Sequence, residues 1–487
     1  MMKMNYRTLM LLLCALWAYS PASNAQERTQ QVTWQDYTLK VNSGDEIAAK
    51  LGVLEVPASH DSRYDNGKNM PLTVVKLPTT SSNPKAPIVY LAGGPGGSGV
   101  SAAKGKRFAL FAKLREISDV IIFEQRGTGL SRGELKDCNY TPKVPMVEHF
   151  TRQSLVKELA SAGEYCQGIW QAQGLNLNHY TTMQSAADLE ALRVALGAEK
   201  LNLWGISYGT HLAMAMAKYY PNSVNRMVLA SSEGLAQTIK LPKYSDKHLA
   251  RIADAVKKDK DAAKRYPDLL KLMADVHQKY RDNPIVVEFK HPKMPQAAKI
   301  GVSDIEIQLM TAYILGRDRE QIAMLPGAYT AMFHSDFSHL APYFYQLKKM
   351  MWQFNPMAVG MDGASGISDS RWQQVKKQSE EALLWRTHNL PYPDMPVAVD
   401  DLGDKFRASF KSDIPSLFIA GTLDGRTFIE EQQQNASQFS QSVFLTVEGG
   451  GHNLFMLSPV ITKQISAFFD EQKIDNKTVN LTEVKFL

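Results

Sequence analysis

Short apolar runs alternate with helical patterns over the first half of the chain. The runs at 88–91 and 120–123 are only four residues long, and each ends at a glycine-containing loop. Ser185–Leu196 and His211–Tyr219 instead place apolar residues at the helical period. This alternation is typical of a mostly parallel sheet covered by helices on both faces. The pattern predicts strands at Val32–Val41, Leu72–Leu77, Ile88–Leu91, Val120–Phe123, Leu201–Trp204, Met227–Leu229, Leu417–Ala420 and Val443–Val447.

The alternation stops in the middle of the chain. Residues 235–413 are rich in Lys, Met and aromatic residues, and their helical patterns are interrupted by prolines. A strand pattern returns at Ser416. We therefore predict a mostly helical lid at 235–413, inserted between two parts of one sheet domain at 26–234 and 414–487.

The N-terminal residues have the pattern of a targeting segment. Lys3 and Arg7 precede an uncharged stretch, and Ser23-Asn24-Ala25 offers small residues for cleavage. This plan predicts a secretory signal peptide over residues 1–25, cleaved after Ala25, and a secreted or periplasmic mature protein. An uncleaved anchor is the alternative, but the apolar core at 9–19 is short for a span of ~20 residues. We expect no stable membrane insertion after cleavage.

Composition narrows the class of protein without indicating its chemistry. The chain has 487 residues, of which 44% are hydrophobic and 21% charged, so it is long and apolar enough for a large globular core. A net charge of +6 from 55 basic and 49 acidic residues is too small to indicate a nucleic-acid partner. Cys138 and Cys166 remain once the signal peptide is removed. In an exported chain they favour one disulfide, with two free buried thiols as the alternative.

Gly205-Ile206-Ser207-Tyr208-Gly209 is the strongest chemical signal. It lies between a predicted strand and a predicted helix. A tight turn there lifts the serine hydroxyl above the sheet, and it needs flanking glycines because larger side chains would collide with neighbouring backbone. The alternative is a glycine-rich turn with a bystander serine. The strand and helix on either side favour Ser207 as a nucleophile.

A nucleophilic serine needs a base and an acid that orients that base. In this architecture the chain order is serine, acid, histidine. Asp424 and His452 each follow a predicted strand, in glycine-containing loops where sheet enzymes place reactive groups. Asp404 and Asp413 are rival acids, but each precedes its strand. We predict a triad of Ser207, Asp424 and His452.

The loop Gly93-Gly94-Pro95-Gly96-Gly97-Ser98-Gly99 follows another predicted strand. A phosphate-binding loop is excluded because the Gly-Lys-Ser/Thr ending is missing. Its backbone N–H groups, with that of Tyr208, are instead predicted to stabilise an oxyanion, and a plain turn is the alternative. No metal or other cofactor is expected. His334 and His339 are five residues apart, which is not a helical ligand spacing, and no His-Glu-x-x-His pattern occurs.

Five motifs occur in a fixed order along the chain. They are Gly93-Gly94-Pro95-Gly96, Gln125-Arg126-Gly127-Thr128-Gly129-Leu130-Ser131, the Ser207 turn, the Asp424 loop and the Gly451-His452 loop. Together they resemble the proline iminopeptidase and tripeptidyl aminopeptidase family of α/β-hydrolases, over 88–229 and 416–469. Tyr180-Thr181-Thr182 and Ala187-Asp188-Leu189-Glu190 are similar to the longer, tripeptidyl-type members. Two residues depart from the family pattern: Ala92 stands in place of His, and Glu124 in place of Asp.

The resemblance implies an α/β-hydrolase fold with a helical lid, and a secreted serine exopeptidase that releases short units from peptide N-termini. It also implies oxyanion donors near Gly94 and at Tyr208. In this family acidic residues bind the free ammonium group of the substrate. Our candidates for that contact are Glu233, which follows a predicted strand, and Asp369 in the lid; ordinary solvated acids are the alternative.

Three functional hypotheses follow. The first is a serine aminopeptidase acting on short peptides. The second is an esterase or amidase that uses the same triad on a non-peptide substrate, since the acyl-transfer machinery is shared. The third is a catalytically dead binding module, which would be expected to lack a triad residue. The sequence does not predict an oligomeric state.

Overall fold

The computed structural model describes residues 31–290, 296–474 and 477–487. The predicted signal peptide at 1–25 lies outside the described residues. Within them, every helix is too short or too polar to cross a membrane.

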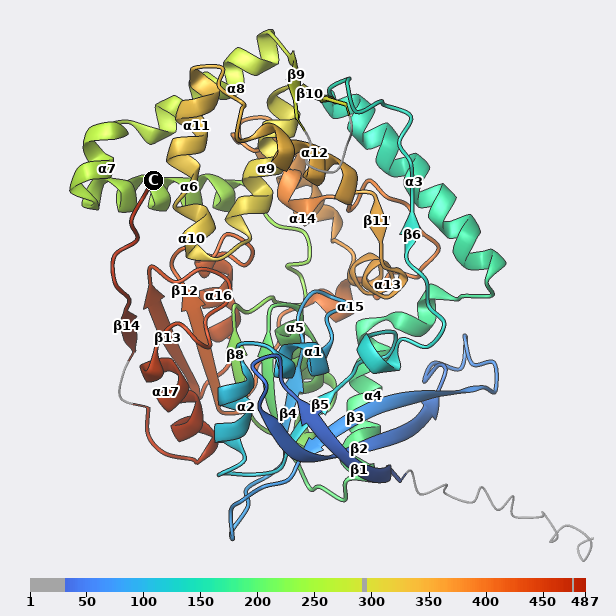
Figure 1. The fold of residues 1–487 in the computed structure, drawn as a ribbon. Coiled ribbons are helices and arrows are strands. Elements are labelled where there is room, and N and C mark those ends of the chain that lie inside the picture. Colours follow the sequence, from blue (N-terminus) through green and yellow to red (C-terminus); the bar gives the residue numbers. More distant parts are fainter. Residues whose placement is uncertain (1–30, 291–295, 475–476) are drawn as a thin grey trace, which may run out of the picture.

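A ten-stranded sheet forms the centre of the molecule (Figure 1). Its first three strands are antiparallel to their neighbours, and the seven strands from β5 to β14 run parallel. The predicted mostly parallel sheet is therefore confirmed. In spatial order the strands are β1 (Thr33–Lys40), β2 (Glu46–Pro57), β3 (Asn69–Leu77), β5 (Val120–Phe123), β4 (Ile88–Leu91), β7 (Leu201–Ile206), β8 (Val224–Ala230), β12 (Ser416–Gly421), β13 (Ser442–Glu448) and β14 (Thr478–Asn480).

Helices cover both faces of this sheet. One face packs against α4 (Thr182–Ala195), α5 (Tyr208–Tyr219) and α16 (Ile429–Ala436). The other face packs against α1 (Gly99–Lys104), α2 (Phe108–Leu114) and α17 (Pro459–Phe469). The central strands β4, β5, β7 and β12 are buried along their whole length, because apolar side chains on both faces meet a helix layer.

A second, mostly helical part lies beyond the carboxyl ends of the parallel strands (Figure 1); we call it the helical cover. Its buried apolar side chains form two clusters, which are separate from the two cores that flank the sheet. It includes α6 (Pro242–Lys258), α7 (Lys260–Arg265), α8 (Leu269–Asp282), β9 (Ile285–Phe289), β10 (Ala298–Val302), α9 (Asp304–Leu315), α10 (Arg319–Ile322), α11 (Leu325–Phe333), α12 (Ala341–Met350), β11 (Gln353–Phe354), α13 (Pro356–Ser365), α14 (Asp369–Ser379) and α15 (Gly403–Arg407).

An earlier segment of the chain also belongs to the helical cover. The strand β6 (Cys138–Asn139) pairs with β11, and α3 (Arg152–Ala172) buries Leu155, Leu159 and Trp170 in the same core as Trp352. The sequence places this segment with the sheet domain at 26–234, whereas the structure packs it against residues of the predicted lid. The disulfide between Cys138 and Cys166 joins β6 to α3, with a Cα–Cα distance of 5.5 Å.

Candidate active site

Ser207 occupies the sharp turn between β7 and α5. Its φ of 54° lies in the left-handed region, which is strained for a residue with a side chain. Two glycines allow this turn to form. A Cβ on Gly209 would lie 2.1 Å from the carbonyl oxygen of Leu91, and one on Gly205 would lie 2.7 Å from the carbonyl oxygen of Gly209. Only glycine fits these approaches, so the sequence pattern and the backbone geometry agree.

His452 and Asp424 lie side by side at the ends of β13 and β12. The imidazole Nδ1 of His452 is 3.0 and 3.1 Å from the two carboxylate oxygens of Asp424. Thr427 donates to the same carboxylate through its backbone N–H at 3.0 Å and its hydroxyl at 2.7 Å. Burial opposes ionisation of Asp424, but His452 and these hydrogen bonds hold its pKa below the usual range. The carboxylate is therefore ionised and holds the imidazole in one orientation.

Ser207 and His452 line one pocket of about 330 Å³. Gly93, Gly94 and Arg426 contribute to the same wall. The structure thus gathers the predicted nucleophile, base and oxyanion loop around a single cavity. No group of three or more His, Cys, Asp or Glu side chains within the described ranges has the arrangement of a metal site.

A buried carboxylate, that of Glu124, holds the predicted oxyanion loop in place. Gly94 has a φ of 128°, and a Cβ there would approach the backbone N of Gly96 at 2.9 Å. Glu124 accepts hydrogen bonds from the Ser98 hydroxyl at 2.6 Å and from the backbone N–H of Val100 at 3.1 Å. The backbone N–H of Tyr208, which directly follows Ser207, is at the first position of α5, where helix N–H groups have no partner in the helix.

Two side chains of the Gln125-Arg126-Gly127 motif make buried hydrogen bonds to other parts of the sheet domain. Gln125 donates to the carbonyl oxygen of Ala92, just before the oxyanion loop, at 3.1 Å. The fully buried Arg126 pairs with Asp188 at 2.6 Å and donates to the carbonyl oxygen of His179. Neither Gln125 nor Arg126 lines the catalytic pocket. Gln125 holds the chain just before the oxyanion loop, whereas Arg126 ties α4 to the segment that precedes it.

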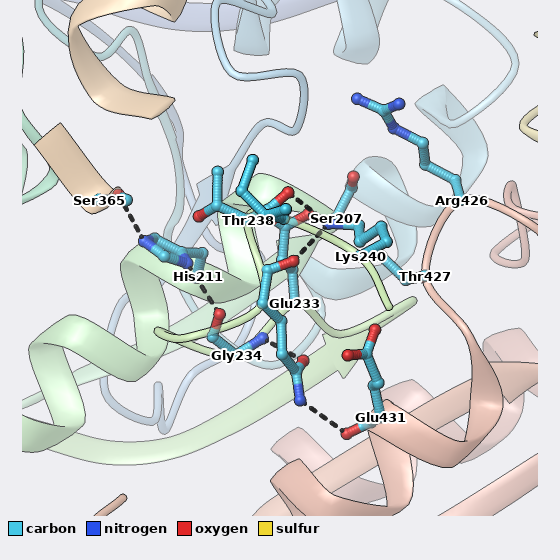
Figure 2. A network of polar contacts seen from close by, with 12 residues as sticks. Ser207, His211, Glu233, Gly234, Thr238, Lys240, Ser365, Arg426, Thr427 and Glu431 are labelled. Atoms are coloured by element: carbon cyan, nitrogen blue, oxygen red, sulfur yellow. Dashed lines mark hydrogen bonds and ion pairs between the residues drawn. The ribbon is translucent and has the colours of Figure 1, made fainter. Parts of the chain in front are cut away.

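The two candidate substrate acids have different surroundings. Glu233 is buried and pairs with Lys240 at 3.0 Å, and Figure 2 shows this pair beside the hydrogen bonds of His211. Burial opposes ionisation of Glu233, but Lys240 above all holds its pKa below the usual range. Asp369 is exposed on the first turn of α14 and does not line the catalytic pocket. Nothing in the structure brings Asp369 to the site.

The sequence reasoning missed Asp362 on α13. Its carboxylate has no hydrogen-bond partner among the described residues, and burial together with the charge of Glu233 raises its pKa to about 7. Neither Asp362 nor Glu233 lines the catalytic pocket, but Arg426, which does, acts on the charge of both acids. Both acids also act on Tyr208, the neighbour of the nucleophile. An acid among the apolar and small residues of 356–365 was the signal available in the sequence.

Comparison with known proteins now decides the family. Residues 86–459 match the family described as "alpha/beta hydrolase fold", which is more than half of the chain. The chain belongs to the alpha/beta hydrolase family. The predicted fold is thereby confirmed, and the order Ser207, Asp424, His452 is the one this fold uses.

Curated relatives of this alpha/beta hydrolase are distant and cover part of the chain. It is 32% identical over 207 residues to a tripeptidyl aminopeptidase of Streptomyces lividans, which is 41% of this chain and 38% of that protein. It is 31% identical over 187 residues to the serine protease Hip1 of Mycobacterium tuberculosis, covering 37% and 35%. A proline iminopeptidase of Xylella fastidiosa is 29% identical over 143 residues, covering 29% and 31%. The matches therefore span well under half of each relative.

Similar solved structures share little sequence with this alpha/beta hydrolase. The structure of Rv0554 from Mycobacterium tuberculosis has 15% identity and a TM-score of 0.38, and covers 86% of this chain and 100% of its own.

Proposed function

We propose that this hydrolase is a serine aminopeptidase that removes short units from the free N-termini of peptides. Ser207 Oγ attacks the scissile carbonyl carbon while His452 takes its proton, and Asp424 stabilises the imidazolium that forms. The N–H groups of the Gly94 loop and of Tyr208 receive the negative charge that develops on the carbonyl oxygen. His452 then protonates the departing amine. Next, His452 takes a proton from a water molecule, which attacks the acyl carbon, and the acyl group leaves as Ser207 Oγ recovers its proton.

The observation that carries the aminopeptidase proposal is the unpaired carboxylate of Asp362 next to Glu233. Burial above all, and then the charge of Glu233, disfavours the ionised carboxylate of Asp362, which has no hydrogen-bond partner among the described residues. A substrate ammonium group would supply a positive charge through a charge-assisted hydrogen bond. Glu233 already has Lys240 as its partner, so Asp362 is the better ligand of the two. The similarity to a tripeptidyl aminopeptidase and to a proline iminopeptidase supports the same proposal.

The decisive experiment compares peptidyl p-nitroanilides of one to three residues with free and acetylated N-termini. We expect hydrolysis of the free-amine series alone, and the best length gives the number of residues released. Ser207→Ala protein is the control for contaminating peptidases. Equal or faster hydrolysis of the acetylated series would contradict the proposal and favour the esterase or amidase alternative.

We further propose that the protein is exported. The signal-peptide pattern over residues 1–25 and the disulfide between Cys138 and Cys166 both support an oxidising compartment. Fractionation of cells that express the full chain, with N-terminal sequencing of the product, tests this. A cytoplasmic protein that retains residues 1–25 would contradict it.

A further inference from the structure

The helical cover contains a second hollow, larger than the catalytic pocket. It has a volume of about 830 Å³ and lies between α9, α10, α11 and α12. This volume is within the ~300–1,000 Å³ typical of ligand sites. We call it the cover groove. Its apolar wall includes Met310, Ile314, Met324, Tyr343, Leu347 and Met350.

The cover groove adjoins the catalytic pocket. Gly316 and Asn453 line both cavities. Asn453 directly follows His452. Its side-chain Nδ2 donates to the Asp318 carboxylate at 2.7 Å, and its side-chain Oδ1 accepts from the Arg107 guanidinium at 2.8 Å. The junction between the two cavities is therefore fixed by hydrogen bonds to both the cover and the sheet domain. A ligand that fills the cover groove as far as this junction therefore lies next to His452.

The wall of the cover groove presents large apolar side chains to solvent. Tyr343 is 64% exposed and Met324 is 46% exposed. Apolar side chains gathered in a concave surface gain free energy when a ligand removes them from water. Methionines adapt their shape to different partners, so such a wall accepts several apolar side chains. Arg317, Asp318 and Asp336 also line the groove, but most of its wall is apolar, so the groove favours an apolar side chain.

The position of the groove decides which half of a substrate it takes. In acyl transfer the histidine protonates the leaving amine, so the leaving half of the peptide lies on the histidine side of the nucleophile. The cover groove opens on that side, next to His452. The acids Glu233 and Asp362, proposed to bind the N-terminal half, line neither the cover groove nor the catalytic pocket. The groove is thus separate from the acids proposed to bind the N-terminus.

We propose that the cover groove binds apolar side chains on the leaving half of the peptide, immediately after the scissile bond. This inference rests on the proposed aminopeptidase function and adds a preference to it. The enzyme then binds the side chains that follow the scissile bond as well as the free N-terminus. Its preferred substrates are peptides in which an apolar residue follows the released unit.

The first test uses the unmodified protein. Peptides share one free N-terminal unit and differ only in the residue after the scissile bond: Leu or Phe against Ser or Asp. We expect kcat/KM to be about tenfold higher for Leu and Phe, the low end of the ~10–200-fold discrimination that an apolar pocket gives. The p-nitroanilide of the same unit is the reference, since its leaving group carries no peptide side chain.

The second test fills the groove. Ala331 on α11 is half-buried in its wall, so Ala331→Trp places a large ring inside it. His334→Trp is the matched control, because His334 is exposed just after the same helix and does not line the groove. We expect Ala331→Trp to lower kcat/KM about tenfold on the Leu and Phe peptides and less than about twofold on the anilide. His334→Trp changes neither value.

These experiments distinguish failure of the groove proposal from failure of the aminopeptidase proposal. If the free-amine anilide is hydrolysed but the residue after the bond has no effect, the groove proposal is wrong and the aminopeptidase proposal stands. The same holds if Ala331→Trp slows anilide and peptide equally, since the groove then serves the acyl half. If no free-amine anilide or peptide is hydrolysed, the aminopeptidase proposal fails and the groove proposal fails with it.

Discussion

Asp362 on the helical cover lies within electrostatic reach of Glu233 on the sheet domain, and burial together with this second carboxylate raises the pKa of Asp362 to about 7. The ion pair of Glu233 with Lys240 keeps the pKa of Glu233 low. Glu233 is thus charged and paired, whereas Asp362 changes its charge near neutral pH and has no hydrogen-bond partner among the described residues. This asymmetry makes Asp362 the more informative residue to change.

Asp362→Asn is expected to weaken the binding of free-amine substrates. At pH 8 we expect KM to rise about tenfold or more, because a hydrogen bond between charged groups contributes ~1.5–3 kcal/mol, and kcat to change little. Asp369→Asn is the matched control on the neighbouring helix and leaves KM unchanged. Steady-state kinetics on a free-amine anilide measures both. An unchanged KM in Asp362→Asn would remove this residue from the substrate site.

The pH dependence of KM gives an independent check on Asp362. Below a pKa of about 7 the carboxyl group is protonated and no longer attracts an ammonium group. In the native protein KM for a free-amine substrate therefore rises as the pH falls through 7. In Asp362→Asn this rise is absent. A KM profile that is the same in both proteins would contradict the assignment.

The same residue has a predictable effect on stability. The pKa of Asp362 is raised above its ordinary value of 3.8, so the ionised form costs free energy of folding. That cost is fully present above pH 7 and falls away between pH 7 and 4. We expect Asp362→Asn to raise the Tm at pH 8 by about 2 °C, and the difference to shrink at pH 4.5. Calorimetry at both pH values measures this, and a pH-independent difference would contradict it.

Changes to the triad should remove activity without unfolding the protein. Ser207→Ala is expected to lower kcat by about 10⁶-fold. Asp424→Asn keeps the size of the side chain but loses the charge that orients His452, and a loss of about 10⁴-fold is expected. Anilide hydrolysis and circular dichroism measure activity and folding. A folded Ser207→Ala protein with more than about 1% of native turnover would show that another residue is the nucleophile.

Two glycines in helices are expected to respond in opposite ways to alanine. A Cβ on Gly209 would meet backbone at 2.1 Å, so Gly209→Ala should displace the Ser207 turn and destabilise the protein by at least ~3 kcal/mol. Gly168 lies on the exposed side of α3 with no atom within 4 Å of the added Cβ. Gly168→Ala should stabilise by up to ~1 kcal/mol through helix propensity. Denaturant unfolding of both proteins tests the pair.

Much of the sheet and the triad is predictable from local pattern. The strand predicted at Ile88–Leu91 has the observed bounds of β4, because a short buried strand is apolar on both faces and ends at a glycine. Asp424 and His452 were accessible to sequence reasoning because parallel strands end at one edge of the sheet, where following loops converge. The strand β2 was missed. Its burial alternates, but the phase changes between Ala49 and Gly52, which conceals the period.

Other features depend on contacts between distant parts of the chain. The candidate acid in the predicted lid was Asp369, and Asp362, which shares an environment with Glu233, was not among the candidates, because only packing distinguishes two acids of the same segment. Glu124 was noted as a departure from the family pattern, and its bonds to Ser98 and Val100 became visible only in three dimensions. The cover groove likewise forms between four helices and has no motif.

The pairing of β6 with β11, and the burial of α3 against residues of the predicted lid, have a consequence for protein engineering. Exchanging residues 235–413 alone with those of a relative would leave the apolar face of α3 opposite a foreign surface. The unit that can be transplanted is therefore discontinuous. A chimera that aims to transfer specificity must carry the disulfide-linked segment 138–172 together with the inserted helices, so that both halves of that shared core come from one parent.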